Sequence, residues 1–219
     1  QNNTPPPPDS HPLSAPKFLE KMEEQATVYG ATIKTGETVE KVSKGDDGIF
    51  SVQTKSGTFI GRSVVLSTGS TYRKLGISGE SELIGAGIHF CATCDGAFYR
   101  DRDIIVIGGG NSALEEGIFL AGFCKSVKIV NNLPNFTASQ TYTDKLPSIE
   151  NITTYMNKNS LEFIADEKDI FKGLKIEDKD SKEQEVLTAD GVFIFIGLIP
   201  NTQIFKNLIE LNKRGFIET

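Results

Sequence analysis

A glycine-rich turn between two patterned segments constrains the fold of this chain more than any other feature. The apolar, β-branched segment 103–107 predicts a buried strand, and residues 111–123 predict a helix. Between them lie Gly108 and Gly110, and Ala113 completes the pattern G-x-G-x-x-A. The first glycine permits a tight bend, the second lets a pyrophosphate approach the backbone, and the alanine lets the helix pack on the strand. The segment predicts a dinucleotide site at the helix start; the alternative is a glycine-rich turn without a ligand.

Later segments continue this alternation of strands and helices. Residues 127–130 are a second apolar strand, so 103–130 predicts a βαβ unit, whose strands are parallel. Further strand candidates lie at 152–155, 161–164, 171–176, 185–188 and 191–196. We therefore expect an α/β fold, with a Rossmann-like NAD(P)-binding domain around a central parallel sheet and a β-meander beside it.

The first part of the chain has a different pattern. Prolines at 5–8 predict an extended lead-in, and residues 14–29 predict an amphipathic helix, with Ser14 as its cap and Gly30 as its end. Three short strand candidates follow at 38–42, 50–54 and 58–60. Such a meander typically decorates a larger sheet.

Residues 63–66 predict a buried strand that runs into a small-residue turn at Thr68 and Gly69. Backbone comes close to a ligand in turns of this kind. An ordinary exit from a strand into a loop explains the same residues equally well. The sequence alone leaves both interpretations open.

Cys91 and Cys94 are separated by two residues, a spacing at which two sulfurs come within bonding distance. A pair of this kind in an α/β protein indicates redox chemistry or a metal. Structural zinc needs four ligands, and no second half-site has the right spacing, so we predict no metal. The pair is therefore interpreted as a dithiol/disulfide switch. Cys124, late in a predicted helix, is interpreted as a buried apolar residue.

Asp95 directly follows the pair. An anion there raises a neighbouring thiol's pKa, so its useful role is proton transfer to and from a departing thiolate. A turn or helix cap is the simpler alternative. His89 competes as the proton carrier, although a histidine between Ile88 and Phe90 is more often a packed or surface side chain.

The end of the second strand normally selects the nucleotide, through an acid for NAD or a basic residue for NADP. Here Asn131 and Asn132 occupy that place. An asparagine can hydrogen-bond a ribose hydroxyl but cannot neutralise a phosphate, which favours NADH. Solvated loop asparagines are the alternative.

Charge and hydropathy exclude several classes of partner. The formal net charge of -6 and the pI near 5.1, with scattered lysines, argue against nucleic acid. The sequence has no apolar run near the ~20 residues of a membrane span and no leader, so we expect no membrane segment and a cytoplasmic protein.

The motifs CATCDG at 91–96, GGGNSALEE at 108–116 and GVFIFIGLIPNT at 191–202 together resemble the low-molecular-weight thioredoxin reductases. The similarity runs from about Phe18 to Gly215, as the middle of a family member. It implies two Rossmann-like domains, one for FAD and one for NADPH. In that scheme 1–86 is a partial FAD-binding domain, 87–215 the NAD(P)-binding domain with the cysteines, and 216–219 the return to the FAD domain.

The resemblance also implies residue roles. Cys94 would exchange electrons with the flavin, Cys91 would attack the protein substrate, and Asp95 would be the acid/base. Thr68 and Gly69 would border the flavin nucleotide. The nicotinamide nucleotide would be held by Gly108, Gly110, Asn111, Ser112, Ala113 and the Gly197 turn, with Asn131 at the ribose. The partner would be thioredoxin or a similar small dithiol protein, and the assembly a homodimer.

Departures from the family pattern leave alternatives. The first FAD motif and the C-terminal flavin segment are absent, so we expect an incomplete FAD site in a chain cut from a longer one. The basic cluster for the NADPH phosphate is replaced by Asn131-Asn132-Leu133, with Thr137 in place of an arginine. NADH or NADPH therefore stays open. The alternatives are a flavin-dependent disulfide reductase with another donor, such as an iron–sulfur protein, and a catalytically incomplete nucleotide-binding fragment. A thioredoxin-like carrier is disfavoured by Gly96 and by the strand at 103.

Overall fold

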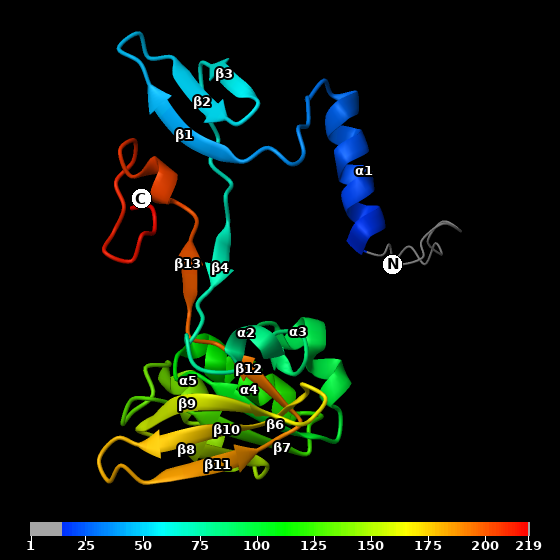
Figure 1. The fold of residues 1–219 in the computed structure, drawn as a ribbon, viewed down its shortest axis with the longest axis vertical. Helices are drawn as coiled ribbons and strands as arrows, with labels where there is room; N and C mark the ends of the chain where they lie inside the picture. Colours follow the sequence, from blue (N-terminus) through cyan, green and yellow to red (C-terminus); the bar gives the residue numbers. More distant parts are fainter. Residues whose placement is uncertain (1–14, 219) are drawn as a thin grey trace, which may run out of the picture. The chain divides into compact units, whose positions relative to one another are not determined.

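The computed structural model describes residues 15–218, which form two compact units (Figure 1). The first comprises the chain up to Leu66 together with Ile204–Glu210, and the second comprises Ser67–Gln203 with the residues from Leu211 onward. The units divide at residue 66, whereas the sequence-based domain boundary lies after residue 86. The difference arises because 67–86 packs with the second unit: Leu83 lies in its core. The assignment of flavin and nucleotide domains remains a prediction.

The second unit is built on a five-stranded sheet with the order β5-β12-β6-β7-β8. All its neighbouring strands are parallel, which confirms the predicted α/β fold. The strands are β5 (Ile88–His89), β6 (Asp103–Ile107), β7 (Ser126–Val130), β8 (Ile152–Tyr155) and β12 (Gly191–Ile194). Helix α4 (Asn111–Ala121) connects β6 to β7 and completes the predicted βαβ unit.

Alternate residues of β6 enter two different hydrophobic clusters. Ile104 and Val106 pack with apolar residues of α4, including Leu114. Ile105 and Ile107 pack on the other side with residues from the next sheet. All four side chains are buried, because a parallel sheet covered on both faces exposes neither of them. A strand that is buried on both faces has apolar residues at every position, which is why residues 104–107 form a continuous apolar run.

The sheet that covers the second face is antiparallel, with the order β11-β10-β9. Its strands are β9 (Lys158–Ala165), β10 (Phe171–Asp178) and β11 (Gln184–Thr188). They confirm the predicted strand pair, with Ile176 opposite Glu185. Phe171, Leu174 and Ile176 are fully buried against the parallel sheet.

Short elements complete the second unit. Strand β4 (Ser70–Tyr72) pairs antiparallel with β13 (Leu198–Pro200). The short helical elements are α2 (Glu80–Leu83), α3 (Ala92–Asp95), η1 (Gly96–Tyr99), α5 (Gln140–Thr143), η2 (Leu146–Ser148) and η3 (Gln203–Phe205), the last of which begins at the boundary between the two units. Of these, α3 and η1 carry the redox motif and the residues after it.

The first unit contains the predicted helix and meander. Helix α1 (Ala15–Val28) precedes Gly30, whose φ of 87° ends the helical run. The strands β1 (Val39–Lys44), β2 (Phe50–Thr54) and β3 (Gly57–Gly61) form an antiparallel sheet in that order. The predicted proline lead-in and the Ser14 cap lie outside the described residues.

The predicted buried strand at 63–66 is wrong. These residues have no strand structure, and Val65 is 88% exposed. The apolar run pairs with no neighbouring strand among the described residues, and an apolar run is buried as a strand only when neighbours cover it. Within 15–218, no helix combines the length and apolar character that crossing a bilayer requires.

Candidate functional site

The turn after β6 has the geometry that its glycines predicted. Gly108 has a φ of 141°, and a Cβ there would strike the carbonyl oxygen of Phe195 and lie 2.9 Å from the Cβ of Ala113. Ala113 itself is fully buried under the turn. Only glycine therefore fits at Gly108. We call residues 108–113 the glycine cradle.

The cradle exposes the start of α4. Gly110 is the cap residue and forms no side-chain hydrogen bond to the first turn of the helix. The leading N–H groups, from Asn111 onward, thus receive no bond from a capping side chain, and the positive end of the helix dipole points the same way. A pyrophosphate fits this arrangement.

A cavity of about 660 Å³ opens over the cradle. It brings together most of the predicted nucleotide-binding residues, namely Gly108, Gly110, Asn111, Ser112, Asn131 and Gly197. Ala113 lies beneath it. Arg73 and Lys158 line the same cavity and were not predicted, because they come from distant segments that carry no motif. Its volume and polar rim suit a dinucleotide.

Asn131 supports the rim of this cavity. Its side chain is buried, and Nδ2 donates to the carbonyl oxygens of Leu133 and Asn135, at 3.1 Å each. Both amide hydrogens are therefore committed to the loop that follows β7. The predicted contact with a ribose hydroxyl has only the amide oxygen available, whereas the neighbouring Asn132 is exposed.

A basic side chain that lines the cavity, Lys158, is neutralised by an ion pair. Lys158, whose N–H donates to the carbonyl of Asn131, places its Nζ 2.8 Å from Asp178. The ammonium group and the N–H groups of Ser181 and Asp180 lower the pKa of Asp178 far below its usual range. Lys179 donates to the carbonyl of Asn132. Arg73 is thus left as the basic cavity-lining side chain without an ion pair among the described residues.

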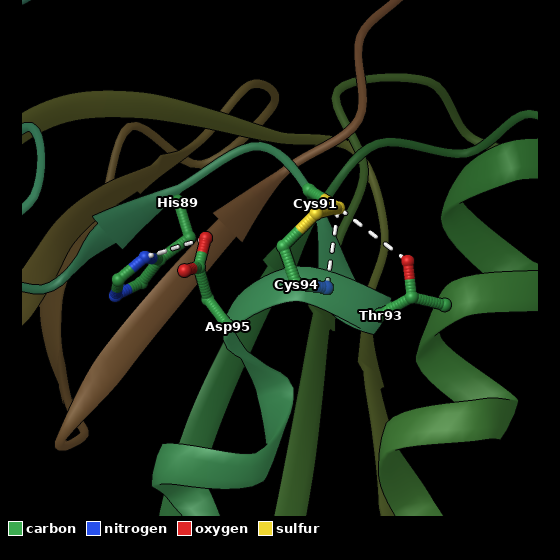
Figure 2. Close-up of a disulfide and its surroundings, with 5 residues drawn as sticks. All are labelled: His89, Cys91, Thr93, Cys94 and Asp95. Atoms are coloured by element: carbon green, nitrogen blue, oxygen red, sulfur yellow. Dashed lines mark hydrogen bonds and ion pairs between the residues drawn. A yellow bond between two sulfur atoms is a disulfide. The ribbon is translucent and has the colours of Figure 1, made fainter. Parts of the chain in front are cut away.

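Cys91 and Cys94 form a disulfide (Figure 2), with their Cα atoms 5.3 Å apart. Cys91 caps α3, and its Sγ accepts a hydrogen bond of 3.2 Å from the N–H of Cys94. The hydroxyl of Thr93 lies 3.4 Å from the same sulfur. A thiolate at Cys91 therefore has two donors within reach, which is how proteins stabilise reactive thiolates. We call residues 91–95 the disulfide segment.

Asp95 contacts His89 rather than capping a helix. Its Oδ2 lies 3.1 Å from Nδ1 of His89, and Nε2 of the same ring lies 2.7 Å from the hydroxyl of Tyr99. Figure 2 shows the carboxylate on the disulfide side of the ring. From the sequence His89 was considered as a competing proton carrier and as a packed or surface side chain, and Tyr99 was not predicted. No sequence pattern predicts the contact between His89 and Tyr99, because β5 and η1 come together only when the protein folds.

The disulfide segment borders a second cavity, of about 740 Å³, whose lining is mostly apolar. Cys94 is exposed and Cys91 is half-buried. Phe98, beside them, is 75% exposed. The disulfide segment follows β5 and the cradle follows β6, so both candidate sites begin at the carboxyl ends of strands in one parallel sheet, where such folds bind ligands.

Thr68 and Gly69 line neither cavity. The Thr68 hydroxyl donates to the carbonyl of Asn201, and the Asn201 amide donates back to the carbonyl of Thr68. The carbonyl of Gly69 accepts from the Asn201 N–H. These three groups therefore form hydrogen bonds within the protein. A flavin contact at Thr68 and Gly69 remains a prediction.

Residues 2–219 match the pyridine nucleotide-disulphide oxidoreductase family. The chain belongs to this family. It is 35% identical over 207 residues to the thioredoxin reductase of Listeria monocytogenes, covering 94% of this chain and 64% of that protein. Over the same length and at the same identity it resembles the 34.2 kDa protein in the rubredoxin operon of Clostridium pasteurianum, covering 66% of it.

The fold comparison agrees with the family assignment. The crystal structure of T. acidophilum thioredoxin reductase superposes with a TM-score of 0.73 at 32% identity, covering 91% of this chain and 65% of that one. The chain thus spans somewhat less than two thirds of the length of these family members. The resemblance to low-molecular-weight thioredoxin reductases is confirmed.

Proposed function

We propose that this chain is part of a disulfide reductase that draws electrons from a reduced nicotinamide nucleotide by way of FAD and passes them through Cys91 and Cys94 to a partner protein. One observation carries the proposal: a two-residue-spaced disulfide lies in the same compact unit as a glycine cradle with a dinucleotide-sized cavity. The FAD is inferred from membership of the family, and when bound it would act as the two-electron carrier. We assign it no residue contacts.

The residues of the disulfide segment suffice for the exchange with a partner. Two electrons break the Cys91–Cys94 bond and leave two thiolates, and the Cys94 thiolate takes a proton from Asp95. The Cys91 thiolate then attacks the partner's disulfide and forms a mixed disulfide, and the partner's departing sulfur takes a proton from solvent. Cys94 returns its proton to Asp95 and attacks Cys91, which restores the internal bond. The partner's second sulfur leaves and also takes a proton from solvent.

The partner we propose is thioredoxin or a similar small dithiol protein. Relatives named thioredoxin reductase support this choice, and so does the exposed Phe98 beside the disulfide, which offers apolar surface to a docking protein. A homodimer and a cytoplasmic location belong to the same proposal.

The residue types at the end of β7 favour NADH over NADPH. A 2′-phosphate is best held by free arginine or lysine side chains. Lys158 is paired with Asp178, and the end of β7 offers two asparagines instead. A non-nicotinamide donor, such as an iron–sulfur protein, is the second candidate, because one relative is described by its place in a rubredoxin operon. The cradle and its cavity favour the nucleotide.

The test compares donors in the complete protein carrying its flavin. Under anaerobic conditions NADH should bleach the flavin absorbance, and NADPH should do so at a concentration at least about tenfold higher, the factor expected for roughly one unpaired charge contact. Bleaching by neither nucleotide would reject the main proposal in favour of the second candidate.

Cysteine variants test the sulfur pathway. Cys91→Ser and Cys94→Ser should each abolish reduction of the partner disulfide. Trapping the mixed disulfide in each variant identifies the attacking sulfur, which we expect to be Cys91. Cys124→Ser is the matched control: that thiol is buried, which raises its pKa to about 11, and its loss should leave the rate unchanged. Full activity in Cys91→Ser would exclude the proposal.

A further inference from the structure

Three side chains extend from the disulfide segment into the core in an unbroken chain of contacts. Asp95 contacts Nδ1 of His89, and Nε2 of His89 contacts the hydroxyl of Tyr99. The side chains of His89 and Asp95 are 11% and 34% exposed, and Tyr99 is buried. These contacts therefore connect a partly exposed carboxylate to a largely buried phenol. The proposed exchange reaction uses Asp95 but assigns nothing to the other two residues.

The two hydrogen-bond partners of the His89 ring, Asp95 and Tyr99, determine which ring nitrogen carries the proton. Burial, followed by the charge of Asp95, raises the pKa of the Tyr99 hydroxyl, so it keeps its proton at neutral pH. An ionised carboxylate only accepts hydrogen bonds, so a neutral His89 ring that bonds Asp95 carries its proton on Nδ1. Its Nε2 is then free to accept from the Tyr99 hydroxyl. Tyr99 thereby stabilises the tautomer that donates to Asp95.

Packing holds the imidazole in this position. The His89 ring stacks on Phe193 with 5.2 Å between ring centroids, and Tyr99 meets the same Phe193 edge-on at 5.5 Å. At Gly191 a Cβ would strike the Tyr99 ring, so the backbone of β12 is shaped around this phenol. The ring of His89 thus has little freedom to turn away from Asp95.

Few charged groups lie near the three side chains Asp95, His89 and Tyr99. Asp95 from α3 faces one ring nitrogen of His89, and Tyr99 from η1 faces the other. Strand β12 presents Phe193 to the ring. Asp190 lies near Tyr99 and is paired with Arg102 at 3.8 Å, and it also accepts a hydrogen bond from the N–H of Asp103. Asp95 is therefore the carboxylate in direct contact with the imidazole.

We infer that His89 is a positioning residue for Asp95 in thiol–disulfide exchange, with Tyr99 fixing its tautomer. This inference rests on the proposed function. The Nδ1–H bond holds one oxygen of the Asp95 carboxylate, which directly follows Cys94 in the sequence. The bond also offsets part of the negative charge of Asp95, and that charge otherwise opposes a thiolate beside it. No bond is broken in this role, and the proton that Asp95 gives to a departing thiolate is the one it regains in the next half-reaction.

The test measures thiols directly and needs neither flavin nor nucleotide. The protein is reduced with dithiothreitol, freed of reductant, and alkylated with iodoacetamide across a pH series, with the modified cysteine identified by mass spectrometry. In His89→Leu the carboxylate loses its donor, so the pH of half-maximal alkylation should rise by about 0.5 to 1 unit, a three- to tenfold lower rate at neutral pH. His89→Asn keeps an amide donor near the Nδ1 position and should recover most of the rate.

Two further variants separate positioning from packing. Asp95→Asn should lower the half-maximal pH, and adding His89→Leu to it should cause no further shift, because the histidine acts through the carboxylate. Tyr99→Phe keeps the aromatic ring packed on Phe193 and removes only the hydroxyl that donates to Nε2 of His89. It should therefore raise the half-maximal pH of alkylation by less than His89→Leu does.

The results discriminate clearly. A pH profile unchanged in His89→Leu, or an equal shift with and without Asp95, would overturn the inference. Should His89→Leu fail to fold, the comparison of His89→Asn and Tyr99→Phe with the wild type gives the same decision. Loss of the inference would leave the proposed function intact, since nucleotide-dependent flavin bleaching and the Cys91→Ser result test that separately.

Discussion

The glycine cradle and the disulfide segment both follow strands of one parallel sheet, β6 and β5, which are separated by β12, but the two sites are built on opposite principles. The cradle works by the absence of side chains: Gly108 admits no Cβ, and Gly110 leaves the helix start uncapped. The disulfide segment works by the presence of particular side chains, each held by another, as His89 holds Asp95.

This difference predicts different responses to mutation. A backbone-built site tolerates changes at its rim but fails when bulk enters it, because its ligand binds main-chain N–H groups. A side-chain-built site keeps its fold when a partner is removed and changes its chemistry instead. Substitutions in the cradle should therefore appear in stability and ligand affinity, and those in the disulfide segment should appear in reactivity.

The largest effect should come from Gly108→Ala. The added methyl group meets the Phe195 carbonyl and Ala113, and the φ of 141° strains any side chain, so we expect a loss of about 3 kcal/mol in the free energy of unfolding. Urea denaturation measures it. Gly197→Ala is the matched control, since its φ of 105° carries the backbone strain while no atom lies within 4 Å of the new Cβ. Equal losses in the two variants would show that steric closure does not shape the cradle.

A smaller effect is expected from Asn131→Ala at the rim. Two backbone carbonyls, those of Leu133 and Asn135, lose their donor, which should cost about 1 to 2 kcal/mol and weaken nucleotide binding severalfold. Thermal unfolding and calorimetric titration with NADH check both parts. The exposed Asn132→Ala should be close to neutral in stability; if it costs as much as Asn131→Ala, the loop is not held by the buried amide.

Thr93→Val tests the disulfide segment with little change in shape. Removing the hydroxyl 3.4 Å from Sγ of Cys91 takes away one of its polar neighbours, so alkylation of the reduced Cys91 should slow about two- to threefold, as expected for loss of a weak hydrogen bond. The free energy of unfolding should stay nearly constant. Thr93→Ser keeps the hydroxyl and should restore the rate; a rate unchanged in Thr93→Val would remove Thr93 from the site.

The smallest effect concerns the pair Lys158–Asp178 at the cavity wall. Because the folded pKa of Asp178 lies below its unfolded value, its contribution to stability is complete above about pH 4 and is lost as the pH falls further. Asp178→Asn should therefore flatten the acid side of the stability profile. Urea midpoints between pH 3 and 6 measure the slope, with the exposed Asp144→Asn as control. A steeper acid loss in Asp178→Asn than in the wild type would contradict this sign.

Local patterns predicted most of the fold. The run of β-branched residues at 103–107 predicted β6 because both faces of that strand are covered, and the meander in 38–60 was predicted from alternation and turn glycines. The run at 63–66 had the same apolar character and was predicted wrongly. Whether such a run pairs depends on the strands beside it, and a local window holds no information about them.

By itself the amino-acid sequence determined the βαβ unit, the glycine cradle and the position of the disulfide, since each rests on residues within one turn or one strand of each other. Only the tertiary structure decided that Asn131 turns into its own loop, that Lys158 is neutralised by Asp178, and that His89 lies between Asp95 and Tyr99. These contacts depend on where a side chain points once its element is packed. A hydrogen bond formed across elements leaves no periodic trace in the chain, whereas burial of a whole face does.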